Sequence, residues 1–259
     1  MKATLITGAS GGIGEAFARR LAAEKHNLVL VARTEEKLAA LCDELMHKHK
    51  IMAHYVALDL IDYEASERLF EETERSGFEI VWLINNAGFG SMNDFAKLEL
   101  ARELEMISLN VSALVALTHR YLQKMRERRS GVIINVSSTA SFQPIPFMAT
   151  YAATKAFVTS FSEAIAEENR PFNIKVVALC PGPTDTNFFN VANAEVFKAK
   201  GIQTPEAVVE TTLNAVESGK SKVISGWTNY VGSVFGSYLP TSIVTRVVGK
   251  ALRGKVENK

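Results

Sequence analysis

The sequence predicts an α/β protein built on one doubly wound parallel sheet of about seven strands, with helices on both faces. Short apolar, β-branched runs alternate with amphipathic helical patterns along the 259 residues. Glycine or polar residues follow several of these runs directly, where a parallel sheet would have its carboxyl edge. No linker, repeat or shift in composition divides the chain, so we expect a single domain over residues 1–259.

The composition fits a soluble globular protein and argues against several functional classes. Apolar residues make up 47% and charged residues 22%, and 29 bases balance 28 acids, so nothing points to nucleic acid. Two cysteines and five histidines show no ligand spacing, so we expect no metal site. A strand begins within the first few residues, and no apolar run reaches ~18 residues. We therefore expect a cytoplasmic protein without a signal peptide or a transmembrane segment.

The first expected strand, residues 3–7, leads directly into a glycine-rich turn that a helical pattern follows. At such a junction the free N–H groups and the dipole of the helix face an anion. Glycines let the backbone approach that anion closely. The spacing is GxxxGxG and not the commoner GxGxxG. The sequence thus predicts a dinucleotide phosphate site, with these candidate contacts: Gly8, Ser10, Gly11, Gly12, Ile13 and Gly14.

The second expected strand, residues 27–32, ends at Arg33. An Asp or Glu at this position would accept a hydrogen bond from the ribose 2′-hydroxyl of NAD, whereas an arginine suits the 2′-phosphate of NADP. The position therefore favours NADP, with NAD as the other cofactor to consider. A solvated charge at the end of a strand is the alternative interpretation.

The third expected strand, residues 51–58, follows a helix over 35–49 and leads into Asp59 and Leu60. The carboxyl ends of strands in such sheets face the ligand crevice, so both residues are candidates for contact with a cofactor. Asp59 is equally well explained as a turn residue or as the cap of the next helix, which we expect over 63–76.

The fourth expected strand, residues 80–84, runs into Asn85-Asn86-Ala87-Gly88. Asparagines at the end of a strand can bond neighbouring backbone and brace adjacent loops, although a plain turn would look the same. A long helical pattern then covers 98–129, and Asn110 interrupts its apolar face. A buried asparagine needs partners, so Asn110 belongs either to a packing network or to the site.

The helix expected over 150–169 carries Tyr151 and Lys155, four residues apart and therefore on one face. A phenol has a reference pKa near ~10, and a nearby ammonium lowers it, so the pair can exchange a proton with a carbonyl or an alcohol. The fifth strand, residues 131–136, ends at Ser137-Ser138, which should point at the same crevice. The alternative is a half-buried tyrosine beside a solvated lysine.

The sixth expected strand, residues 173–179, ends in a proline-rich turn, and the segment 187–204 follows it. The apolar stripe of this segment predicts either a lid over an apolar substrate or a piece of the core. Its members are Phe188, Phe189, Val191, Val196 and Phe197.

The last part of the chain is the least regular. A helix over 206–218 and a strand over 222–225 precede the segment 226–259, which is apolar and aromatic with glycine and proline breaks and becomes basic at its end. We expect a packed element or a subunit interface there. A cover for the substrate mouth or a contact with a membrane surface are the alternatives.

These motifs, in this order, resemble the short-chain dehydrogenase/reductase family. The resemblance spans Lys2 to about Gly226, and the segments that carry it are Thr7–Gly14, Asn85–Gly88, Asn110, Ser138, Tyr151-x-x-x-Lys155 and Pro181-Gly182. It implies a Rossmann fold and an NAD(P)-dependent reductase or dehydrogenase of a small carbonyl or alcohol compound. It also implies a homodimer or homotetramer formed through the two long helices. A non-catalytic NADP-binding regulator and an epimerase or dehydratase are the alternatives.

For the cofactor, the resemblance implies that the glycine turn holds the pyrophosphate and that Asp59 meets the adenine. The segment Asn86–Gly88, with Ala87 between, would flank the adenosine ribose and support the sheet. Thr184 or Thr186, after the Pro181-Gly182 turn, would touch the nicotinamide carboxamide.

For catalysis, the resemblance implies that Tyr151 is the general acid in reduction and the base in oxidation. Ser138 would bond the substrate oxygen. Lys155 would hold the nicotinamide ribose and lower the pKa of Tyr151, and Asn110 would brace a water that links Lys155 to solvent.

Overall fold

A computed structural model of the protein describes residues 1–194 and 202–257. Its strands form one seven-stranded parallel sheet in the order β3-β2-β1-β4-β5-β6-β7. The order reverses between β1 and β4, where an open α/β sheet forms its ligand crevice. The doubly wound sheet predicted from the sequence is confirmed. The strands are β1 Lys2–Thr7, β2 Leu28–Ala32, β3 Ala53–Ala57, β4 Glu79–Asn85, β5 Gly131–Val136, β6 Ile174–Cys180 and β7 Lys222–Ile224.

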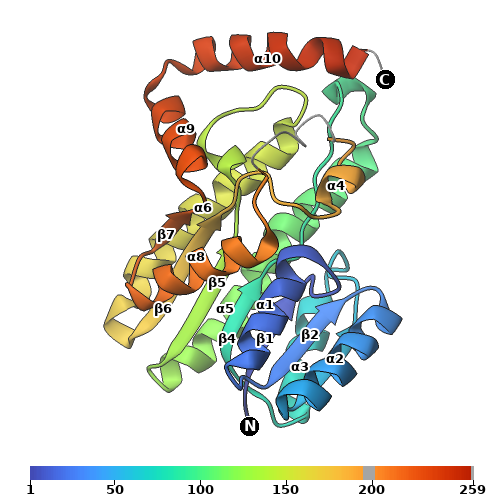
Figure 1. Cartoon of the computed structure of the whole chain (residues 1–259), viewed down its shortest axis with the longest axis vertical. Coiled ribbons are helices and arrows are strands. Elements are labelled where there is room, and N and C mark those ends of the chain that lie inside the picture. Colours follow the sequence, from blue (N-terminus) through green and yellow to red (C-terminus); the bar gives the residue numbers. More distant parts are fainter. Residues whose placement is uncertain (195–201, 258–259) are drawn as a thin grey trace.

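Helices cover both faces of the sheet (Figure 1). One face carries α1, α2 and α8, the other carries α3, α5 and α6, and α10 lies across the end of the molecule opposite the N-terminus. The helices are α1 Gly12–Ala23, α2 Glu35–His49, α3 Ala65–Arg75, α4 Leu100–Ile107, α5 Leu114–Glu127, α6 Ala149–Asn169, α7 Phe188–Val191, α8 Pro205–Glu217, α9 Trp227–Tyr238 and α10 Thr241–Glu257. None of the described helices combines the length and hydropathy that crossing a bilayer requires.

The central strands are mostly apolar because helices cover them on both sides. Only the first residue of β1 is exposed, and β2 is buried up to Ala32. The edge strand β3 is partly exposed throughout, and it is shorter than the expected 51–58. An edge strand has a neighbour on one side only, so less of its length is held in the ladder.

The helix expected over 98–129 is interrupted by the π-helical turn Ser108–Ala113, which joins α4 to α5. A π turn adds a residue to the helix and often marks a functional site. Asn110 lies in this turn and is 1% exposed. The wider turn thus places a polar side chain on the inner face of a continuous helical segment, which explains the interruption in its apolar pattern.

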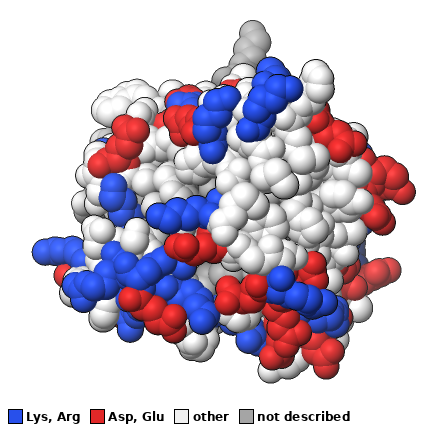
Figure 2. All heavy atoms as spheres, turned by 90° about the horizontal axis from the view of Figure 1, so that it is seen from below, with Lys and Arg blue, Asp and Glu red and all other residues white. Residues whose placement is uncertain are grey.

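Figure 2 shows the face of the molecule at which the strands begin, and Lys and Arg side chains are frequent on it. Helices of a doubly wound sheet run opposite to the strands, so they end on this face. Cations in the last turn of a helix complement its dipole, as Lys48 does in α2. Arg128, just beyond α5, lies 3.7 Å from Glu79 at the start of β4. The basic residues here therefore have a structural explanation.

A third apolar cluster lies beyond the carboxyl edge, in addition to one cluster on each face of the sheet. It contains Phe89 and Met106 before and within α4, Tyr151 of α6, Phe189 of α7 and Leu252 of α10. Segments far apart in the chain thus meet above the strand ends.

A chain of buried side-chain hydrogen bonds ties β4 and β5 to α5 and α6. The Asn85 Nδ2 donates to Asn135 Oδ1 at 2.9 Å and to Thr118 Oγ1 at 3.0 Å. The Asn135 Nδ2 donates to Ser162 Oγ at 2.9 Å, and the Ser162 hydroxyl donates to Val158 O. Buried polar groups are stabilising only when they are bonded, so the members of this chain depend on each other.

We expect Asn135→Ala to lower the free energy of unfolding by about 2–4 kcal/mol, because it leaves an Asn85 amide proton without a protein acceptor and removes a second bond. Urea unfolding measures this change. Asn214→Ala, on the exposed face of α8, is the control and should change the same free energy by less than about 0.5 kcal/mol. Equal effects of the two variants would contradict the role of the chain.

Candidate active site

Ser138, Tyr151 and Lys155 meet at the carboxyl edge of the sheet. Tyr151 lies in the first turn of α6 and Lys155 one turn later, and they are 8% and 6% exposed. Ser138 follows β5, its hydroxyl accepts from Ala140 N–H at 3.1 Å, and it lies close enough to the Tyr151 phenol to lower the pKa of that phenol. The Lys155 Nζ lies 5.8 Å from the centre of the Tyr151 ring. Both side chains are therefore buried, unlike the half-buried tyrosine and solvated lysine of the alternative interpretation.

Burial raises the pKa of Tyr151 to about 12, and the hydrogen bond with Ser138 opposes this shift only in part. The expectation that Lys155 lowers this pKa is wrong for the protein alone. The reason is the position of the ammonium, which donates to the Val136 carbonyl at 2.8 Å and not to the phenol. At neutral pH the phenol is therefore protonated and able to donate.

Burial also lowers the pKa of Lys155 to about 8, because a charged ammonium loses its hydration there. The Val136 carbonyl is the one protein acceptor that the described residues provide for it. The Ser137 hydroxyl donates to the Lys155 carbonyl at 2.8 Å and so fixes α6 against the end of β5. The Val136 carbonyl thus holds the side chain of Lys155, and the Ser137 hydroxyl holds its backbone.

The Asn110 side chain braces the loop after β4 against α6. Its Nδ2 donates to Phe89 O at 2.9 Å and to Thr154 Oγ1 at 3.1 Å, and its Oδ1 accepts from Phe89 N–H. The Thr154 hydroxyl in turn donates to the Tyr151 carbonyl. Asn110 thus belongs to the network beside the pair. The expected role of Asn110 in bracing a water that links Lys155 to solvent stays a prediction.

The glycine turn between β1 and α1 fits a phosphate. Gly12 has a φ of 57°, a conformation that favours glycine, and a Cβ at Gly14 would lie 2.3 Å from Gly8 O. No side chain caps the amino end of α1, and the space beside Gly11 is open for at least 4 Å. The N–H groups of the first turn are thus free to bind an anion. Ser10 lies in the same turn, and Ile13 packs against the core.

Arg33 and Asp59 lie together at the ends of β2 and β3, where the adenosine half of a dinucleotide would lie. Their closest atoms, Nη1 and Oδ2, are 3.9 Å apart, and both side chains are about half exposed or more. Asp59 also accepts from Ile61 N–H at 3.0 Å, as a turn residue does. Leu60 is 6% exposed and packs in the core, so its side chain is unsuited to the expected cofactor contact.

The segment Asn86–Gly88 fastens β4 to β1 at the crevice. The Asn86 Nδ2 donates to Thr7 O at 2.9 Å and to Gly8 O at 3.1 Å, and Ala87 N–H donates to the Thr7 hydroxyl. A Cβ at Gly88 would lie 2.8 Å from Asn110 Oδ1 and 3.5 Å from Lys155 Nζ. The support of the sheet that we expected from this segment is therefore present.

The loop after β6 brings Thr186 to the glycine turn. A Cβ at Gly12 would lie 2.9 Å from the Thr186 methyl group, whereas Thr184 is 5% exposed and donates to Gly182 O within its own loop. The position of Thr186 makes it the better candidate for contact with a nicotinamide. Pro181 is buried and accepts from Thr139 N–H, which joins this loop to the one after Ser138.

Phe188 covers the Tyr151 ring, with the two ring centres 5.2 Å apart. Gly90 makes this approach possible, since a Cβ there would lie 2.9 Å from Phe188 Cζ and 3.1 Å from Tyr151 Cδ2. Sequence reasoning missed Gly90, although its place after Asn85–Gly88 was a signal. Of the apolar stripe, Phe189 is buried, Val191 is exposed, and Val196 and Phe197 lie outside the described residues, as does much of the segment 187–204.

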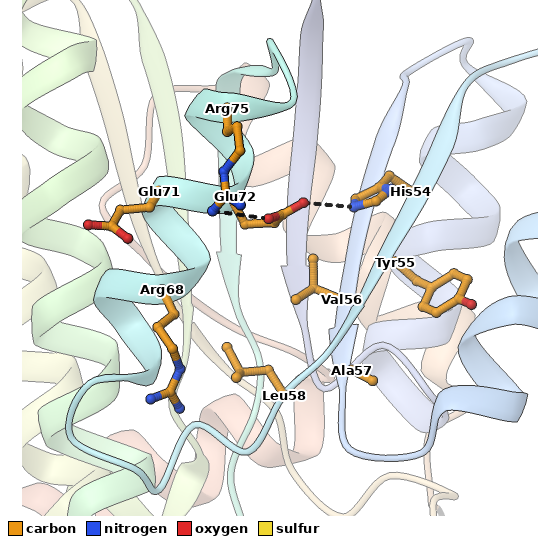
Figure 3. Close-up of a pocket in the computed structure, with 9 residues that line it drawn as sticks. All are labelled: His54, Tyr55, Val56, Ala57, Leu58, Arg68, Glu71, Glu72 and Arg75. Atoms are coloured by element: carbon orange, nitrogen blue, oxygen red, sulfur yellow. Dashed lines mark ion pairs between the residues drawn. The ribbon is translucent and has the colours of Figure 1, made fainter.

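A hollow of about 520 Å³ lies elsewhere, between β3 and α3 (Figure 3). Arg75, Glu72 and His54 form a row of ion pairs across it, with distances of 3.4 and 3.9 Å. It lies on the flank of the sheet, so we do not assign the reaction to it. A second hollow, of about 210 Å³, is lined by Gly90, Arg102 and Val191 and adjoins the site.

Comparisons with known proteins bear on the family and the fold of the chain. The chain matches the short chain dehydrogenase family over residues 2–196. A 3-oxoacyl-(acyl-carrier-protein) reductase of Aquifex aeolicus is 31% identical over 195 residues, which are 75% of this chain and 79% of that protein. A very-long-chain 3-oxoacyl-CoA reductase-B of Danio rerio is 28% identical over 253 residues, 95% of this chain and 79% of that protein. The structure of a short-chain dehydrogenase from Sphingobium yanoikuyae in complex with NADPH has a TM-score of 0.83 at 29% identity, covering 93% of this chain and 96% of that one.

The lowered pKa of Lys155 predicts a pH dependence of stability. Between about pH 8 and 10 the unfolded chain keeps a proton on this lysine that the folded protein has lost, so stability rises with pH. We expect the stability of the wild type relative to Lys155→Met to rise by about 2 kcal/mol over this range. Urea unfolding at several pH values measures it, with Lys37→Met on the exposed face of α2 as the control. A constant difference would contradict the burial of a charge here.

Proposed function

This chain belongs to the short-chain dehydrogenase/reductase family, and we propose that it reduces an apolar carbonyl compound, or oxidises the matching alcohol, with NADP(H). The observation that carries the proposal is the meeting of the Ser138 and Tyr151 hydroxyls beside a buried Lys155, at the edge that also carries the free N–H groups of α1. Family membership makes the chain an oxidoreductase. The roles of the residues, the cofactor preference and the substrate are our proposal.

In reduction, bound NADPH supplies a hydride to the carbonyl carbon. Negative charge then develops on the carbonyl oxygen, and the hydroxyls of Ser138 and Tyr151 are placed to donate to it at ~2.7–3.1 Å. Tyr151 delivers its proton to this oxygen, and in oxidation it accepts the proton of the alcohol. A phenol with a pKa of about 12 is almost fully protonated at neutral pH, which suits it to the reductive direction.

Lys155 holds the nicotinamide ribose in this proposal. Its ammonium is preorganised, because Val136 O and the turn of α6 fix its direction before any ligand arrives. The hydrogen bonds of Asn110 keep the loop after β4 and the first turns of α6 at a constant separation. Both residues therefore place the reacting groups, while Tyr151 and Ser138 contact the substrate.

Arg33 is the residue that favours NADP. Its guanidinium is exposed, and a pair at 3.9 Å between exposed side chains contributes little free energy. It is therefore free to turn from Asp59 to a 2′-phosphate, which it can bind with two parallel hydrogen bonds. The NADPH bound in the Sphingobium yanoikuyae structure supports this choice.

An apolar substrate suits the surroundings of Tyr151. The apolar cluster at this edge includes Phe89, Met148 and Phe189, and Phe188 lies directly on the tyrosine ring. The adjoining hollow between the loop after β4 and α7 offers space beside them. The similarity to 3-oxoacyl reductases supports a ketone on an acyl chain as the first class to test. A cytoplasmic location and a homodimer or homotetramer stay predictions.

We expect Tyr151→Phe to keep NADPH binding and to lose turnover by at least ~10²–10³-fold, since the proton donor for the developing oxyanion is gone. NADPH oxidation by the wild type and the variant, measured with 3-oxoacyl thioesters and other apolar ketones, tests this. Tyr63→Phe, at an exposed tyrosine before α3, is the matched control. Unchanged turnover in Tyr151→Phe would contradict the proposal. Binding of NADPH by the wild type without any oxidation would favour a regulator, and product without net change in NADPH an epimerase or dehydratase.

We expect Arg33→Ala to weaken NADPH binding by more than about tenfold, or ~1.4 kcal/mol, and to leave NADH binding nearly unchanged. The physical reason is the loss of a charged partner for the 2′-phosphate. Calorimetry with both cofactors measures the two affinities. Arg170→Ala, an exposed arginine at the other end of the fold, is the control. Equal or tighter NADH binding by the wild type would show that Arg33 is only a surface charge.

A further inference from the structure

We propose that the outer faces of α9 and α10 form a docking surface for the anionic surface of a lipid bilayer. The sequence alone did not decide whether the segment 226–259 is a packed element or a contact surface. In the structure it forms two helices that pack on one side only. The inference stands apart from the proposed reaction, because it depends on residues outside the site.

The outer faces of these helices carry an unusual amount of exposed apolar surface. Seven large apolar side chains of the two helices and their connection are about half exposed or more: Trp227 77%, Tyr230 46%, Phe235 70%, Tyr238 83%, Leu239 53%, Ile243 52% and Val247 62%. Trp227 and Tyr230 stack on each other at 5.9 Å. Isolated exposed apolar residues are ordinary, but seven of them within residues 227–247 mark an interaction surface. Aromatic residues with one polar atom are favoured where apolar and aqueous phases meet.

Helix α10 has two distinct faces. Val244 and Leu252 are buried, at 8% and 5% exposure, and Val248 packs beside them against the cluster above the strand ends. Ile243 and Val247, four residues apart, point to the opposite side. Figure 1 shows α10 lying across one end of the molecule, so that one side of the helix faces away from the sheet. The helix is therefore placed to lie flat on a surface, as interfacial helices do.

The charge of this region selects the chemistry of the partner. Residues 226–256 contain no Asp or Glu, and their charged residues are the bases Arg246, Lys250, Arg253 and Lys255. At helical spacing Arg246, Lys250 and Arg253 form one row beside Ile243 and Val247, and all three are exposed. None of the three has an ion-pair partner among the described residues, whereas many arginines of the other helices do. Cations that flank an apolar strip complement anionic headgroups above acyl chains.

A second copy of the chain fits this surface less well. In a two-fold symmetric contact the same patch meets itself, so the rows of Arg246, Lys250 and Arg253 would face like charges. The other exposed apolar residues that a subunit contact would use, Leu104 of α4 and Phe157 of α6, lie on other helices. An anionic bilayer satisfies both the apolar strip and the cations.

The inner faces of the same helices adjoin the candidate site. Asn229 of α9 lies directly beside Gly182. A Cβ atom added to Gly182 would lie only 2.2 Å from the Asn229 Nδ2. Leu252 belongs to the same apolar cluster as Tyr151. A bilayer on the outer faces would thus hold the carboxyl edge of the sheet close to the lipid phase, which suits the supply of an apolar substrate.

Co-sedimentation of the full chain with lipid vesicles tests the inference. We expect the protein to bind vesicles of phosphatidylglycerol mixed with phosphatidylcholine, to bind pure phosphatidylcholine much less, and to be released in part by salt. Arg246→Gln combined with Lys250→Gln should lower the partition coefficient on the order of tenfold or more. Ile243→Ser combined with Val247→Ser should lower it comparably, because apolar burial is lost.

Matched variants elsewhere keep the test specific. Lys37→Gln with Lys48→Gln on α2, and Met52→Ser with Tyr63→Ser, remove the same kinds of group from exposed positions and should leave vesicle binding unchanged. Thermal unfolding checks that every variant folds. Absence of binding to anionic vesicles, or equal losses with the control variants, would overturn the inference. So would a dimer in sedimentation velocity that only Ile243→Ser with Val247→Ser dissociates, which would assign the surface to a second copy. None of these readouts depends on catalysis.

Discussion

The buried ammonium of Lys155 is the interaction on which the site depends. A charge removed from water is costly, and here the protein offers it one carbonyl, that of Val136, and a lowered pKa. The neighbouring residues hold the side chain in this one position. Gly88 leaves room beside its Nζ, and the Ser137 hydroxyl fixes its backbone. A ligand that brings further hydrogen-bond acceptors would therefore stabilise the charged form of Lys155.

The same edge is held together by side chains rather than by the sheet alone. Asn86 ties the end of β1 to the end of β4, Asn85 and Asn135 tie β4 to β5, and Asn110 ties the following loop to α6. Each asparagine donates from its side-chain amide near the carboxyl ends of these strands, and Asn110 and Asn135 also accept there. The crevice is therefore rigid in the positions at which a cofactor and a substrate would be aligned.

Periodicity predicted the frame of the molecule because a parallel sheet buried on both faces leaves a strong pattern. The expected strand 131–136 and helix 35–49 agree with the structure residue for residue. Two of the features that the sequence did not predict depend on contacts between distant segments. The raised pKa of Tyr151 reflects burial by α7 and the loop at Gly90, and the pairing of Arg33 with Asp59 reflects the neighbouring ends of β2 and β3. Asn110 was visible as an interruption, but a π turn has no sequence pattern of its own. Glycines and Pro240 interrupt the helical pattern of the last two described helices, so the sequence did not predict them.

Helix α10 shows why burial and function cannot be separated at this edge. Its inner face packs in the cluster that contains Tyr151, so the residues that complete the wall of the site come from the end of the chain. Its outer face exposes Ile243 and Val247, and residues 241–256 carry cations and no acids. A helix needed only as a wall would gain solubility from polar residues on that outer face, at no cost to the packing inside. The fold therefore does not explain the apolar outer face. The lipid bilayer that we propose on that side of the helix would explain it.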